Sequence, residues 1–145
     1  MHRPSLIRVS ALVELAAGGL LLAAPSAGAR LLFDRGLEAA ESLTIARIGG
    51  AALLSIAMIC WLVERFEQGA ATVVVGGLSV YNALTVVLLG YAALVFRMHG
   101  LALWPGILLH AVLFGWCVAR LRADDTARRS SALRRGPVLG ERAIH

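Results

Sequence analysis

Long apolar segments separated by short polar ones dominate the pattern along this chain. An apolar run of about 20 residues has the length of a membrane-spanning helix. Four such segments occur, and they predict spans near residues 5–24, 43–63, 70–96 and 101–120. The last two connections are only a few residues long, so the helices that they join must be antiparallel neighbours. The pattern therefore predicts an all-α fold, an integral membrane four-helix bundle.

The composition agrees with a membrane protein. Hydrophobic residues make up 59% of the 145 residues, charged residues only 16%, and the mean hydropathy is +0.76. A soluble domain of this size could not bury so much apolar surface. Residues 121–145 differ, because they are basic and lack a sustained apolar stripe. We therefore expect a transmembrane bundle over residues 1–120, followed by a flexible cytoplasmic tail.

The arginines predict how the bundle is oriented. All 14 basic residues are arginines, and an even number of spans places both termini on one side. Ten arginines belong to that side and four to the other, which by the positive-inside rule puts both termini in the cytoplasm. The ten are Arg3, Arg8, Arg65, Arg120, Arg122, Arg128, Arg129, Arg134, Arg135 and Arg142, and the four are Arg30, Arg35, Arg47 and Arg97. No aromatic residues alternate with the tail arginines, so we expect the tail to meet anionic lipid and not nucleic acid.

Three of the spans carry one strongly polar residue close to the middle. These residues are Glu14, Asn82 and His110. A charged group at the centre of the bilayer costs about 2.5–3.5 kcal/mol on insertion scales. At similar depth the three side chains can satisfy one another, so we predict a single polar site. Tyr81, beside Asn82, and Arg47, near the outer end of the second span, are its further candidate members.

The partner of Glu14 decides what such a site can do. A pair with Arg47 would keep the carboxylate ionised, whereas a contact with His110 would form an acid–base or proton-exchange pair. Asn82, Arg47 and Tyr81 would then be ligand-binding residues. The sequence leaves both partners open. It also leaves open that Asn82 and His110 only hydrogen-bond neighbouring helices, and that Arg47 extends outward to the interface.

Metal and haem sites find little support in the sequence. Two of the four histidines are close to the termini, His99 lies in a loop and His110 is alone in its span, so no pair occurs at suitable depth. Cys60 and Cys117 lie in apolar helices next to tryptophans, where ordinary packing explains them. We therefore predict no cofactor and no metal ion.

The apolar motifs of about the first 65 residues carry a family resemblance. They cover Arg8–Ser10, Leu20–Pro25, Leu31–Phe33 and Ala46–Leu54. In these segments the chain resembles small four-helix bacterial membrane proteins of the DoxX-like kind. The resemblance implies a location in the bacterial inner membrane and, from what is known of some of those proteins, a link to respiratory-chain sulfur oxidation with quinone.

Three functions fit this sequence. The first is an accessory or quinone- or lipid-associated membrane subunit that uses the polar site. The second is a proton-coupled small-molecule exporter, because the carboxylate in Leu12-Val13-Glu14-Leu15 is similar in position to that of the small multidrug resistance exporters. The third is a membrane enzyme for a lipid-soluble substrate, with Glu14 and His110 as its acid–base pair. Membrane lipid is the expected partner, and a homodimer or a larger membrane complex would fit equally.

Overall fold

The computed structural model describes residues 3–63 and 68–134, and all regular secondary structure in these two ranges is helical. Its helices are α1 (Arg3–Ala23), α2 (Pro25–Phe33), α3 (Ala40–Val63), α4 (Gln68–Leu94) and α5 (Leu103–Arg134). All except α2 are long and apolar enough to cross a membrane. The prediction of an all-α, multi-pass membrane protein with four spans is confirmed. The short helix α2 lies in the first connection.

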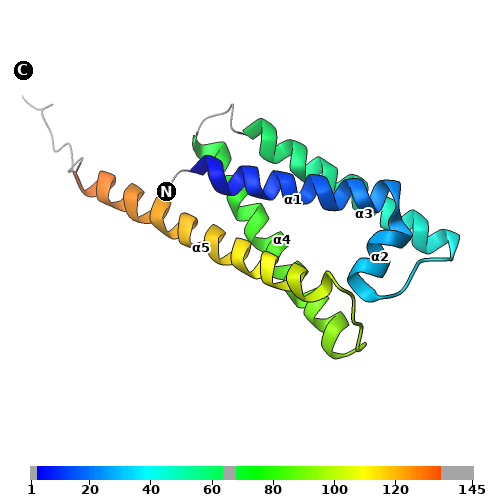
Figure 1. Cartoon of the computed structure of the whole chain (residues 1–145). Helices are drawn as coiled ribbons and strands as arrows, with labels where there is room; N and C mark the ends of the chain where they lie inside the picture. The colour runs from blue at the N-terminus through cyan, green and yellow to red at the C-terminus, as the bar shows by residue number, and fades with distance from the viewer. Residues whose placement is uncertain (1–2, 64–67, 135–145) are drawn as a thin grey trace, which may run out of the picture.

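The four long helices form two pairs. α1 packs mainly against α3, and α4 packs mainly against α5 (Figure 1). The pairs meet where α1 and α4 begin and α3 ends, and we call this the terminal end of the bundle (Figure 1). From there they diverge towards α2, which marks the opposite end, the α2 end (Figure 1). Buried apolar residues from all four long helices form the core at the terminal end: Leu6, Ile7, Ala11, Cys60, Val63, Val75, Leu78, Leu113 and Cys117.

Two glycines bring the backbones of α1 and α3 into contact. A Cβ added to Gly18 would lie 2.8 Å from the carbonyl oxygen of Gly50, and one added to Gly50 would lie 2.8 Å from the carbonyl oxygen of Gly18. Neither position has room for a side chain. The adjacent Gly19 and Gly49 would meet nothing within 4 Å. Gly18 and Gly50 therefore form the line of contact between α1 and α3, which we call the seam, whereas their neighbours Gly19 and Gly49 do not. Small residues commonly pack membrane helices in this way.

α2 joins α1 to α3 along the chain and also contacts the second helix pair, at the start of α5. Pro25 begins it, since a first-turn residue has no need of a backbone N–H, and this separates α2 from α1. Asp34 ends it in the left-handed conformation, with φ 58°, and its N–H donates to the carbonyl of Arg30 at 2.9 Å. The N–H of Ala102 donates to the carbonyl of Leu31 at 2.8 Å, which ties α2 to the segment before α5.

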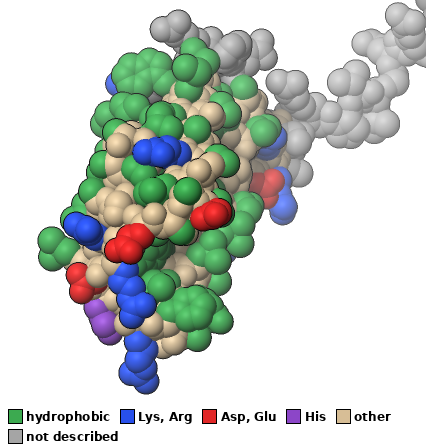
Figure 2. Space-filling view, turned by 90° about the vertical axis from the view of Figure 1, so that its right-hand side faces the viewer, with side chains coloured by type: hydrophobic (Ala, Val, Ile, Leu, Met, Phe, Trp, Pro, Cys, Tyr) green, Lys and Arg blue, Asp and Glu red, His purple; other side chains and the backbone are tan. Residues whose placement is uncertain are grey.

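The α2 end carries a polar surface. Figure 2 views the molecule from this end, where acidic, basic and histidine side chains gather among hydrophobic ones. The N–H of Leu37 donates to Ser26 Oγ at 3.0 Å, so the connection to α3 folds back onto α2. Such a mixture of side chains suits the water–lipid interface and not the hydrocarbon core. The α2 end therefore marks one boundary of the membrane-spanning region.

The last helix is longer than the sequence predicts. We expected a span near 101–120 and a flexible tail, but α5 is a single helix of 32 residues that ends at Arg134. At 1.5 Å per residue it is about 48 Å long, more than the ~30 Å of a hydrocarbon core, so its last turns extend beyond the bundle (Figure 1). An ion pair one turn apart, Arg129 to Asp125 at 3.0 Å, supports this extension. The flexibility predicted for residues 135–145 lies outside the described residues.

Candidate functional site

Glu14 is enclosed in the interior of the bundle. It lies on α1 and its residue surface is 1% exposed. The hydroxyl of Tyr81, on α4, donates a hydrogen bond to Glu14 Oε2 at 3.0 Å. Because α1 and α4 belong to different helix pairs, this bond joins the two pairs across the interior.

His110, on α5, is held by an amide. Its Nδ1 lies 2.7 Å from Asn82 Oδ1. An amide oxygen only accepts, so the imidazole donates from Nδ1. Asn82 Nδ2 in turn donates to the carbonyl of Leu78 at 2.7 Å, which fixes the orientation of the fully buried amide. The His110 ring also meets the Tyr81 ring edge-on, with centroids 5.7 Å apart and an interplanar angle of 80°.

Glu14, Tyr81, Asn82 and His110 thus form one contiguous group, which we call the polar cluster. Glu14 and His110 do not bond to each other directly. Tyr81 lies between them, since it donates to the carboxyl group and packs edge-on against the imidazole. The structure therefore brings together four of the five predicted site residues. Their roles in catalysis or ligand binding stay predictions.

Arg47, the fifth predicted site residue, lies outside the polar cluster. Its side chain is exposed on α3, whereas Glu14 is enclosed. Among the described residues, Glu14 bonds Tyr81 through Oε2, and its Oε1 has no hydrogen-bond partner. The expected contact of Arg47 with Glu14 is therefore not formed. The alternative fits better, in which the long cationic side chain extends outward to the polar interface.

Ser10 belongs to the site environment, although it was not among the predicted site residues. It lies one turn before Glu14 on α1 and is fully buried. Its Oγ, like Glu14 Oε1, has no hydrogen-bond partner within the described part of the chain. The signal was present in the sequence as a spacing of four residues, which places both side chains on one face of a helix.

An apolar groove lies beside the polar cluster, between α3 and α4. Its volume is about 260 Å³, and Tyr81 is part of its wall. Ile59 and Gly77 at its mouth are exposed, so the groove opens towards the surrounding membrane. The remaining residues of this α3–α4 groove are Ile56, Cys60, Val74 and Leu78.

No protein-family model, curated protein or solved structure matches this chain. The interpretation of the site therefore rests on its own residues. Over residues 3–63 and 68–134, no group of three or more His, Cys, Asp or Glu side chains could hold a metal ion. That the protein uses no cofactor stays a prediction.

The polar cluster combines a carboxyl group, a phenol and an imidazole in an apolar interior. All three can hydrogen-bond a ligand, and such bonds are stronger in a medium of low dielectric constant. The arrangement can therefore hold the polar end of a molecule whose remainder is apolar. In this arrangement Glu14 and His110 bond different partners, Tyr81 and Asn82, and do not form a direct acid–base pair.

Proposed function

We propose that this chain is a small multi-pass membrane protein that binds a lipid-soluble molecule, of the quinone or lipid class, in the α3–α4 groove. The observation that carries the proposal is the position of Tyr81. Its residue lines the groove, and its hydroxyl bonds the buried Glu14. An apolar wall with one polar group at its inner end is typical of ligand sites.

The shape of the groove supports a ligand that arrives through the membrane. A lipid-soluble molecule can enter sideways past Ile59 and Gly77 without crossing water. The Tyr81 hydroxyl donates its one proton to Glu14, so its oxygen would accept a hydrogen bond from a donor on the ligand, such as the hydroxyl of a quinol, while the chain of the ligand would lie along Ile56 and Val74. The resemblance to DoxX-like proteins is part of the same proposal, since quinone-linked chemistry is implied there too.

The geometry is less favourable to the other two functions. An exporter that works as a dimer would present its carboxylate to the substrate path, but Glu14 is enclosed within one chain. An acid–base enzyme would need Glu14 and His110 in contact, but Tyr81 lies between them. We therefore propose an accessory protein of a larger membrane complex, with both termini in the cytoplasm of the bacterial inner membrane, as the arginines predict.

Native mass spectrometry of the gently extracted protein tests this proposal. We expect the wild-type chain to retain a quinone or another lipid-soluble molecule. Gly77→Leu should lose it, because the new side chain projects into the groove and would meet no atom within 4 Å at its Cβ. The matched control is Gly76→Leu. A Cβ added at Gly76 would also meet no atom within 4 Å, but Gly76 does not line the groove.

Two outcomes would contradict the proposed function. The first is a wild-type protein that carries no lipid-soluble ligand and binds none when a short-chain quinone is added to nanodiscs. The second is a Gly77→Leu protein that retains the ligand as well as Gly76→Leu does, which would locate the ligand outside the α3–α4 groove.

A further inference from the structure

Two buried oxygen atoms on α1 have no hydrogen-bond partner. They are Ser10 Oγ and Glu14 Oε1, and their residues are 0% and 1% exposed. Side chains four residues apart on a helix have Cβ atoms about 5–6 Å apart, so both oxygens face the same part of the interior. Native proteins satisfy nearly all buried oxygens, with ordered water where no protein donor is at hand.

We propose that Ser10 and Glu14 bind a water molecule inside the bundle. With two hydrogen bonds of about 2.8 Å at a roughly tetrahedral angle, one water bridges oxygens about 4.5 Å apart, a separation that side chains one helical turn apart can reach. Water donates and accepts, so it satisfies Glu14 Oε1 whether the carboxyl group is charged or neutral. The site uses the carboxyl oxygen that Tyr81 leaves free, and it does not depend on a ligand in the α3–α4 groove.

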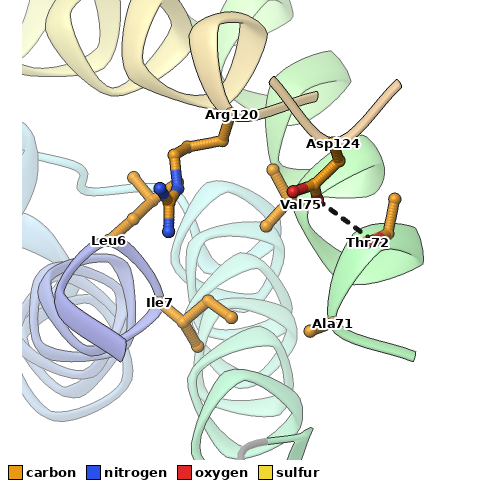
Figure 3. Close-up of a pocket in the computed structure, with 7 residues that line it drawn as sticks. All are labelled: Leu6, Ile7, Ala71, Thr72, Val75, Arg120 and Asp124. Atoms are coloured by element: carbon orange, nitrogen blue, oxygen red, sulfur yellow. Dashed lines mark hydrogen bonds between the residues drawn. The ribbon is translucent and has the colours of Figure 1, made fainter. Parts of the chain in front are cut away.

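A small cavity lies near the terminal end, one helical turn before Ser10 on α1, and we take it as the entry side for this water. Its volume is about 10 Å³, roughly the room that one water needs. Figure 3 shows residues of α1, α4 and α5 around it, with Arg120 reaching from α5 towards Leu6 on α1. At its polar side the Thr72 hydroxyl donates to Asp124 Oδ2 at 3.3 Å. Leu6 lies one turn before Ser10, so the cavity, Ser10 and Glu14 follow one another along α1 towards the middle of the membrane.

Infrared spectroscopy of the protein in lipid nanodiscs tests the water site. The carboxyl band of Glu14, in its acid or its carboxylate form, is the band that Glu14→Gln abolishes. Ser10→Ala removes one partner of the water and should shift this band. The matched control is Ser55→Ala, because Ser55 Oγ is exposed on α3 and donates to the carbonyl of Ala51 at 3.0 Å. An unshifted band in Ser10→Ala would overturn the proposal.

The direction of the change in melting temperature gives an independent test. If Ser10 holds a water, Ser10→Ala should lower Tm, because the water loses a partner. If the hydroxyl is merely buried without a partner, its removal should raise Tm, since an unsatisfied polar group disappears. Ser55→Ala should leave Tm nearly unchanged. A Tm that rises or stays the same in Ser10→Ala contradicts the bound water.

Entry from this side is tested by the rate of deuterium uptake at the Glu14–Tyr81 pair, followed through the same infrared band. Thr72→Val removes the hydroxyl at the cavity while keeping the shape of the side chain, and it should slow uptake severalfold. Thr85→Val is the control in the same helix, because the Thr85 hydroxyl bonds the Tyr81 carbonyl at 2.9 Å, away from the cavity. Equal rates in wild type and Thr72→Val overturn entry from the terminal end.

Discussion

The two helix pairs are held together by different means. α1 and α3 touch through their backbones, at Gly18 and Gly50. α4 and α5 are joined by side chains, with His110 bonded to Asn82 in the interior and Thr72 bonded to Asp124 at the terminal end. Hydrocarbon supplies no hydrophobic drive between helices, so close packing and hydrogen bonds must replace it. The α1–α3 pair relies mainly on close packing, and the α4–α5 pair relies mainly on hydrogen bonds.

The same difference gives glycine two uses. In α1 and α3, Gly18 and Gly50 create contact between helices. In α4, Gly77 would meet nothing within 4 Å if it had a Cβ, and it lies at the mouth of the α3–α4 groove. A glycine in a membrane helix can therefore bring another helix close or leave room for a ligand. The α1–α3 pair supplies Glu14, and the α4–α5 pair supplies Tyr81, Asn82 and His110.

The largest expected effect comes from breaking the backbone contact of α1 and α3. Gly50→Leu should lower the free energy of unfolding by about 3 kcal/mol or more, since its side chain would overlap the backbone of α1. Gly49→Leu is the control, because it has the same helix propensity and open space at its Cβ. Titration with sodium dodecyl sulfate in mixed micelles measures both. Equal losses in the two variants would show that the seam does not determine stability.

A smaller loss is expected where the two pairs are joined. Tyr81→Phe removes the donor to Glu14 Oε2 and should cost about 1–3 kcal/mol, because it leaves a buried carboxyl oxygen without its partner. Tyr91→Phe, at a tyrosine of the same helix that is 52% exposed, should change stability by less than about 0.5 kcal/mol. If the Tyr81→Phe protein is as stable as Tyr91→Phe, the hydrogen bond from Tyr81 to Glu14 adds nothing to the free energy of unfolding.

The side-chain link within the α4–α5 pair should be measurable as a coupling. A double-mutant cycle of Asn82→Ala and His110→Ala is expected to give about 0.6–1.7 kcal/mol, the range for hydrogen bonds between membrane helices. A cycle of Glu14→Gln and His110→Ala should give less, because Tyr81 separates these residues. A larger coupling for Glu14 than for Asn82 would indicate direct contact of the carboxyl group with the imidazole.

The fold was largely predictable, because the length of an apolar segment determines whether it can span the membrane, and a spanning segment must be helical. The end of α5 was not. Hydropathy falls near Arg120, which predicts the end of the span there. It marks where hydrocarbon ends, but Ala, Arg and Leu remain good helix formers in water, so the helix continues to Arg134.

The candidate site was predictable in depth but not in its contacts. Positions near the middle of three spans indicated Glu14, Asn82 and His110, and the structure brings these together with Tyr81. Which side chains meet depends on the rotation of each helix and on its neighbours. α1 packs chiefly on α3, yet Glu14 bonds α4, a choice that periodicity alone does not determine. For the same reason the sequence leaves open whether Arg47 meets Glu14 or extends outward, and in the structure its side chain is exposed.

The smallest expected effect concerns α2, the short helix that contacts both helix pairs at the end where they diverge. Asp34 ends α2 with φ 58°, a conformation that glycine adopts without strain, and its charge lies at the negative end of the helix dipole. Asp34→Gly should therefore raise stability by up to about 1 kcal/mol. Arg35→Gly, one residue later and without a positive φ, should lower it slightly. Thermal melting of both variants in nanodiscs compares them directly. If Asp34→Gly lowers the melting temperature as much as Arg35→Gly does, the left-handed conformation at Asp34 does not limit the stability of the protein.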